Sequence, residues 1–143
     1  EYLETKGVPV IGYNTDKLPA FFTRTSDINV DFNAKTPLDI AKIVKEKRDY
    51  KLDGGVLVCD PIPEQYSLAP EYINKEIDKM KNISKEKFID VYQKFNINMN
   101  HVHFSKIVEL TGGKSLETNI HLILNNAELG AKIASEYAKL RNK

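Results

Sequence analysis

The stretch of this sequence closest to a phosphate-binding motif is Gly112-Gly113-Lys114-Ser115. In a P-loop, backbone amides and a lysine hold phosphate groups, and the motif needs another glycine five residues before the second one, after a strand. That position is Val108, and the preceding FSKIVEL has the apolar spacing of a helix. The sequence therefore predicts a corner between two helices, with Gly112 as a left-handed cap and Ser115 as the next N-cap. Anion binding at the free amides of that helix start stays open.

Two asparagines on the segment after this corner are candidate binding residues. Asn119 and Asn126 are seven residues apart, so on a helix they lie almost above one another. They flank an apolar stripe that we expect to be buried: Leu116, Ile120, Ile123, Ala127, Gly130, Ala134 and Tyr137. An asparagine beside a buried face needs partners for its donor and its acceptor. Either a structural role or ligand binding would satisfy it.

Polar residues also follow the expected strands, where open α/β sheets bind ligands. Arg24 is followed by two hydroxyl residues and could hold a phosphate, while Asp60 could orient a hydroxyl or a metal-bound water. The alternative for each is ordinary turn and cap chemistry. His101 and His103 point to different sides of a helix, so no metal site is predicted there. His121 is expected to be a surface residue.

The elements that would position these residues indicate an α/β protein. Short apolar runs at 8–13, 20–24, 28–32 and 56–59 predict strands, and Thr36-Pro37 starts a helix that runs to about residue 50. A strand, a helix and a continuously apolar strand favour a layered α/β/α arrangement with a largely parallel or mixed sheet. The C-terminal third is expected to be helical, with helices at 70–81, 85–95, 101–110 and 116–140.

Composition excludes several classes of protein. The 143 residues carry a formal net charge of +1, which is no footprint for a nucleic-acid partner. No apolar run approaches the ~20 residues that span a membrane. Cys59 is the only cysteine, so no intrachain disulfide can form, and a reducing, cytoplasmic location is expected. Residues 1–7 resemble the end of a helix, which predicts that residues 1–143 are a piece of a longer protein.

Four blocks in order resemble one known family: EYLETKGVPVIGY, LPAFFTRTS, GGVLVCDPIPEQ and ELTGGKSLETNIHLILNNAELGAKIA. Together they are similar to the C-terminal half of the pseudouridine-5′-phosphate glycosidases, the indigoidine synthase A-like family. The resemblance implies a homotrimeric enzyme about twice as long as this chain. Residues 1–143 would then be the C-terminal part of one α/β domain whose N-terminal half lies outside this chain. It would cleave the C–C glycosidic bond reversibly to uracil and ribose 5-phosphate, using a divalent metal such as Mn²⁺ and a lysine that forms a Schiff base. The lysine, the acid glutamate and the aspartates of the family lie upstream of Glu1.

The resemblance therefore implies no catalytic residue and no metal ligand in this chain, and only substrate-binding residues. Asn119, in the block ETNI, matches an active-site asparagine of the family, and Asn126, Arg24 and Thr25 lie in matching blocks. Asp60 departs from the pattern, since the family reads Asn-Pro-Ile-Pro there. Asn100-His101 replaces a Thr-Pro before the last helical corner.

Three functional hypotheses follow. The first is the C-terminal portion of such a glycosidase, inactive alone and partnered by its N-terminal half and by pseudouridine 5′-phosphate. The second is a catalytically inactive homologue or fragment that serves as a binding or assembly module. The third, a carbohydrate kinase, has no positive support in the sequence.

Overall fold

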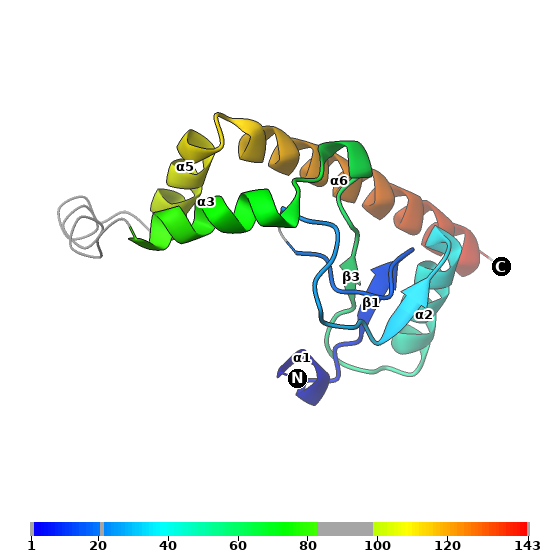
Figure 1. Cartoon of the computed structure of the whole chain (residues 1–143). Coiled ribbons are helices and arrows are strands. Elements are labelled where there is room, and N and C mark those ends of the chain that lie inside the picture. Colours follow the sequence, from blue (N-terminus) through cyan, green and yellow to red (C-terminus); the bar gives the residue numbers. More distant parts are fainter. Residues whose placement is uncertain (1, 21, 83–98, 143) are drawn as a thin grey trace.

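The computed structural model describes residues 2–20, 22–82 and 99–142, with side chains left undescribed at 80–82 and 99–104. Figure 1 shows a small sheet at one end of the structure, a group of helices at the other end, and a long helix that runs along both. In chain order the elements are α1 (Tyr2–Thr5), β1 (Val10–Tyr13), β2 (Phe32–Ala34), α2 (Pro37–Asp49), β3 (Leu57–Cys59), the 3-10 turn η1 (Glu64–Tyr66), α3 (Pro70–Asn82), α5 (Met99–Leu110) and α6 (Lys114–Arg141). The helix expected at 85–95 lies outside the described residues.

The sheet is parallel, with strand order β2-β1-β3. In the central strand, Ile11 lies opposite Phe32 of β2 and Val58 of β3. All three strands therefore end at the same edge, which we call the carboxyl edge. The expected α/β class, with a parallel sheet and a helical C-terminal third, is confirmed.

The main core lies between the sheet and helices α2 and α6. Ile11, Ala34 and Ile40 are buried together, and Ile133 of α6 packs against them. Helix α2 begins with the signal that its sequence carries. The Thr36 hydroxyl accepts a hydrogen bond from the Asp39 amide, and the Asp39 carboxylate accepts one from the Thr36 amide, which completes a capping box.

The strand expected at 20–24 is wrong in the part that the structure describes. Residues 22–24 form bends in the long connection from β1 to β2. Phe22 lies outside the sheet and packs with Ile73 of α3 and Ile107 of α5 in a second core. Hydroxyl groups shape the connection locally, since Ser26 donates to the carbonyl of Leu18. The strand expected at 28–32 is displaced to Phe32–Ala34.

Helix α6 exists as expected, but the stripe chosen as its buried face is wrong. Leu116, Ile120 and Ile123 are exposed. The residues that α6 buries are Ser115, Thr118 and Leu129. The inner face is partly polar because it meets backbone as well as side chains: the Thr118 hydroxyl donates to the Tyr66 carbonyl at 2.9 Å. Hydrophobicity alone could not identify such a face.

Candidate functional site

The corner before α6 is a folding device and not an anion site. Gly112 and Gly113 both have left-handed backbones, with φ of 58° and 88°. Gly113 is the N-cap, so the prediction of Ser115 as N-cap is wrong. Ser115 is fully buried, and its hydroxyl accepts from the Thr111 hydroxyl at 2.9 Å.

The amides at the start of α6 already have partners. The amide of Lys114 donates to the Thr111 carbonyl, and that of Ser115 donates to the Thr111 hydroxyl. The next two, at Leu116 and Glu117, both donate to the Gly113 carbonyl. An anion at this helix start would have to displace these bonds. The alternative of phosphate binding at the GGKS motif therefore finds no support here.

Lys114 itself turns to a different neighbour. Its ammonium lies 5.9 Å from the centre of the Tyr72 ring, within the range of a cation–π contact. A cavity of about 240 Å³ opens beside Lys114, between α6 and the segment that includes η1. On the same surface His121 stacks on Tyr66, with ring centroids 3.4 Å apart and planes 5° apart. His121 is thus a packing residue that joins α6 to η1, which corrects the expectation of a plain surface histidine.

The carboxyl edge holds the polar cluster that best fits a functional site. Asp60 follows β3, and its carboxylate accepts a hydrogen bond of 2.7 Å from the side-chain amide of Asn125 on α6. The same amide nitrogen lies 3.5 Å from the Pro61 carbonyl. The Arg24 guanidinium donates to the Ile62 carbonyl. Arg24 and Asn125, both distant from the loop in sequence, therefore hold the loop that leaves β3 in place.

The predicted site residues are only partly brought together. Arg24 lies in this cluster as a support of the loop, while Thr25 next to it is exposed, with its carbonyl accepting from Thr23. Asn119 is half-buried on α6, and Asn126 is exposed. Neither asparagine has a side-chain hydrogen bond to another described residue.

Asn125 is the residue that sequence reasoning missed. A signal was present: Ser115, Thr118, Leu122, Asn125 and Leu129 repeat every three or four residues, as one helix face does. The positions of this face lie one or two residues before those of the more hydrophobic stripe. Hydrophobicity therefore favoured the stripe as the buried face.

The Asp60 carboxyl group has an unusual protonation equilibrium. Its pKa is raised to about 6, because burial and, to a smaller extent, Glu128 raise it by more than Arg24 and Lys132 lower it. A carboxyl group with such a pKa exchanges protons near neutral pH, the property that acid–base chemistry requires. The cluster has the character of a functional site, since perturbed pKa values concentrate there.

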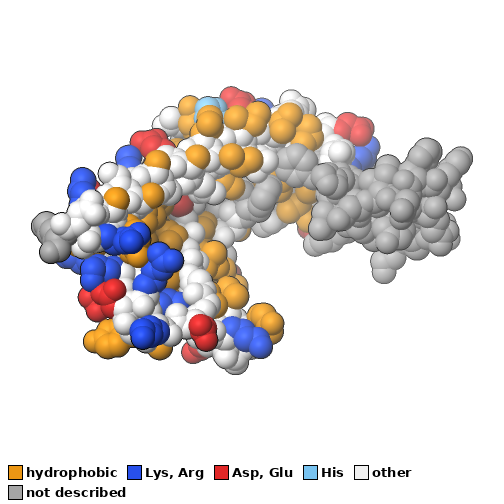
Figure 2. All heavy atoms as spheres, turned by 180° about the vertical axis from the view of Figure 1, so that it is seen from behind, with side chains coloured by type: hydrophobic (Ala, Val, Ile, Leu, Met, Phe, Trp, Pro, Cys, Tyr) orange, Lys and Arg blue, Asp and Glu red, His pale blue; other side chains and the backbone are white. Residues whose placement is uncertain are grey.

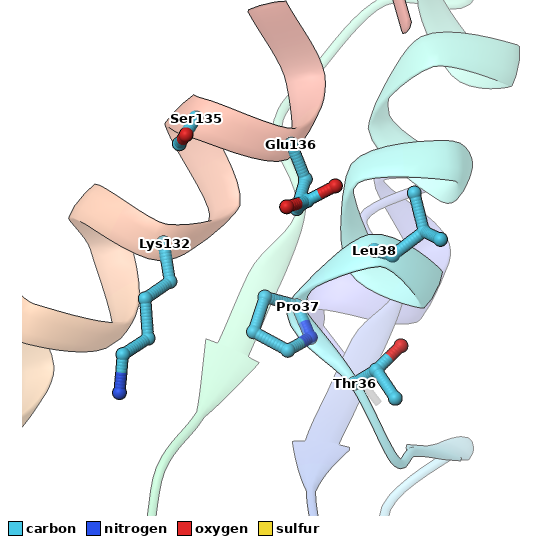
Figure 3. A pocket seen from close by; sticks show the side chains of 6 residues that line it. All are labelled: Thr36, Pro37, Leu38, Lys132, Ser135 and Glu136. Carbon is cyan, nitrogen blue, oxygen red and sulfur yellow. The ribbon is translucent and has the colours of Figure 1, made fainter. Parts of the chain in front are cut away.

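A cavity of about 470 Å³ lies between the start of α2 and the last third of α6 (Figure 3). Its lining comprises Thr36, Pro37 and Leu38 from α2 and Lys132, Ser135 and Glu136 from α6. Helix α2 follows β2 directly, so the cavity also lies towards the carboxyl edge. Lys132 pairs with Glu128 at 2.6 Å, which leaves the cavity without an unpaired cation among its described lining.

We expect the Asp60→Asn variant to be more stable than the unchanged chain at pH 8 and to show no such gain at pH 4. The pKa of Asp60 in the folded state lies above its ordinary value of 3.8, so the folded state binds the proton more tightly. Stability therefore falls as pH rises from about 4 to about 6. Asparagine removes this loss and can still accept from Asn125. We expect a gain of about 1 kcal/mol, because solvent screens this half-buried group.

Urea denaturation at the two pH values measures this difference. Asp53→Asn, an exposed carboxylate before β3, is the matched control and should give no pH-dependent gain. A loss of stability in Asp60→Asn at pH 8 would mean instead that Arg24 stabilises the ionised carboxylate more than burial disfavours it.

Neither a candidate metal cluster nor a membrane-spanning helix is present among the described residues. No group of three or more His, Cys, Asp or Glu residues that could hold a metal ion occurs in residues 2–20, 22–82 and 99–142, with the undescribed side chains set aside. The side chains of His101 and His103 are among those undescribed. None of the helices in the described part of the chain is long and apolar enough to cross a membrane.

Comparisons with known proteins agree on one family. Residues 1–136 match the model of the family described as indigoidine synthase A like protein. The chain is 49% identical over 137 residues to the pseudouridine-5′-phosphate glycosidase of Petrotoga mobilis and 46% identical over 145 residues to that of Mycoplasmopsis agalactiae. These matches cover 96% and 97% of this chain but 43% and 44% of the relatives. The chain thus spans less than half the length of these relatives.

Two solved structures share the fold. The prealnumycin C-glycosynthase AlnA, in complex with ribulose 5-phosphate, matches with a TM-score of 0.78 at 24% identity, over 99% of this chain and 45% of its own. An indigoidine synthase A-like protein from Thermotoga maritima matches with a TM-score of 0.73 at 27% identity, over 92% of this chain and 41% of its own.

Proposed function

The chain belongs to the indigoidine synthase A-like family, and from this membership we propose that it is the C-terminal part of a pseudouridine-5′-phosphate glycosidase. The observation that carries the proposal is the sequence identity of 40–49%, over nearly the whole chain, to curated relatives of that name. The proposed reaction is the reversible cleavage of the C–C glycosidic bond to uracil and ribose 5-phosphate.

This reaction needs groups beyond those that this chain supplies. A C–C bond offers no leaving-group oxygen to protonate, so paired carboxylates alone do not suffice. A lysine that forms a Schiff base with the opened ribose provides the electron sink. We propose that this lysine, the acid glutamate and the ligands of a divalent metal such as Mn²⁺ belong to the other part of the family fold.

In this scheme the chain contributes binding and orientation. Asn119 would contact the substrate with its amide, which has no other described partner. Arg24 holds one carbonyl and keeps further N–H groups for a phosphate. Asn126 and Thr25, both exposed, would complete the contacts once the rest of the fold is present. Asp60 would exchange a proton near neutral pH at the edge where substrates of open α/β sheets bind.

We expect Asn119→Ala to lower uracil release from pseudouridine 5′-phosphate by about tenfold or more. A hydrogen bond to a charged group contributes roughly 1.5–3 kcal/mol, so its loss has at least this effect. The assay uses this chain co-expressed with the unmatched part of the Petrotoga mobilis glycosidase, in the presence of Mn²⁺. The chain alone should give no turnover.

Asn142→Ala, at the exposed end of α6, is the control and should retain full activity. A complex that binds the nucleotide but releases no uracil would contradict the proposed glycosidase. Such a result would favour a binding or assembly module, the alternative hypothesis. A homotrimeric assembly and a cytoplasmic location stay predictions.

A further inference from the structure

The outward face of α6 is apolar and has no cover in the described structure. Its large side chains are 42% exposed at Leu116, 49% at Ile120, 57% at Ile123 and 60% at Leu124. Figure 2 shows hydrophobic side chains along this helix on the side turned away from the sheet. Single exposed apolar residues are ordinary, but a continuous row on one helix marks an interaction site.

The row continues towards the C-terminus with small residues. Ala127, Gly130, Ala131 and Ala134 are all exposed and fall at the same three- and four-residue spacing. We call the whole row, from Leu116 to Ala134, the outer stripe. Large side chains followed by small ones allow another element to approach the helix closely along its length.

Helix α6 also buries its opposite side. Ser115, Thr118 and Leu129 are buried against the remainder of the chain, and Ile133 reaches the core of the sheet. A helix that is already buried on one side and carries an apolar stripe on the other is typical of a helix enclosed within a larger protein. We therefore expect the outer stripe to be covered by protein and not to face solvent.

The edges of the sheet, like the outer stripe, are uncovered in the described part of the structure. Within the described residues β2 and β3 each pair only with β1, so the sheet has an open edge on both sides. Phe32 on β2 is 53% exposed and Leu57 on β3 is 40% exposed. Open edges and exposed apolar side chains indicate that further strands and helices belong here. A second copy of this chain seated on α6 would cover the stripe but would leave both edges open.

Relatives with this fold have additional polypeptide that could cover the outer stripe and the sheet edges. In the two solved structures of this fold, the match covers only 45% and 41% of the solved protein's own chain. More than half of each of those proteins has no counterpart in this chain. We propose that the outer stripe of α6 is the docking surface for this other part of the family fold, which presents an apolar surface to it. The proposal rests on family membership and does not depend on the glycosidase activity.

The test is co-purification of this chain with its partner. The unchanged chain and its variants are each co-expressed with an affinity-tagged unmatched part of the Petrotoga mobilis glycosidase, and the amount of chain retained is measured. We expect Ile123→Asp and Ile120→Asp to reduce retention at least tenfold, because each would place an unpaired carboxylate in an apolar interface. Leu52→Asp is the matched control, since Leu52 is 60% exposed in the loop after α2. It should be retained like the unchanged chain.

Three outcomes would overturn the proposal. Full retention of Ile123→Asp and Ile120→Asp, or no retention of the unchanged chain, would show that the stripe is not this interface. Self-association of the chain alone, dispersed by Ile123→Asp, would assign the stripe to a second copy. Circular dichroism of the isolated variants checks that folding is unchanged, as expected for exposed positions. A retained complex that releases no uracil would leave the docking surface standing and contradict only the proposed reaction.

Discussion

Replacing Gly12 with alanine is expected to cost about 3 kcal/mol of the free energy of unfolding, at the upper end for overpacking a core. A Cβ atom at this position would lie 2.2 Å from the Thr15 carbonyl oxygen and 2.9 Å from side-chain carbons of Thr15 and Val30. The nearest of these atoms is backbone, and β1 is paired on both sides, so the clash cannot be relieved by rotating a side chain. The connection from β1 to β2 has to move instead.

Urea denaturation of Gly12→Ala measures this cost. Gly130→Ala is the control, because nothing lies within 4 Å of its added Cβ and the residue is in the middle of α6. Alanine there should stabilise the isolated chain by about 0.5–1 kcal/mol, the helix propensity difference. Equal effects of the two substitutions would contradict the close approach at Gly12.

Replacing Ile40 with alanine is expected to cost about 3–4 kcal/mol, within the range for buried aliphatic truncations. Ile40 is completely buried and packs with Ile11 and Ala34 at the contact of α2 with the sheet. Truncation removes its apolar area from this contact and leaves a cavity. Because domains of this size are stable by only about 5–15 kcal/mol, this loss is a large fraction of the total free energy of unfolding.

The Ile28→Ala variant provides the comparison, since Ile28 is 61% exposed in the connection before β2. Its stability should change by less than about 0.5 kcal/mol. The midpoint of the urea transition should shift for Ile40→Ala with an unchanged slope. A small shift for Ile40→Ala would mean that the surrounding helices collapse into the cavity.

Local signals made part of this fold predictable. Thr36, Pro37 and Asp39 specify the start of α2 through contacts within four residues, and the structure has the capping box in full. The strands β1 and β3 are short apolar runs between turn residues, which the sequence displays directly. In both cases the information that determines the structure lies inside the segment itself.

The remainder depends on contacts between distant segments. The run that includes Phe22 is hydrophobic enough for a strand, but α3 and α5 together offer it a separate core. The inner face of α6 contains Asn125, whose partner Asp60 is distant in the chain. The helical repeat that contains Asn125 is visible in the sequence, but nothing within α6 favours this partly polar face over the more hydrophobic stripe, so the stripe was mistaken for the buried one. The same stripe is now the candidate interface.

The position of β1 in the middle of the sheet has a consequence for the order in which its contacts form during synthesis. Both described neighbours of β1 follow it in the sequence, and Ile133, which packs on the same core, lies in α6. A nascent chain therefore cannot complete these contacts of β1 until α6 has been synthesised. Such delayed, long-range pairing slows folding and favours aggregation in the meantime. The contacts of β1 are consequently among the last in this part of the fold to form.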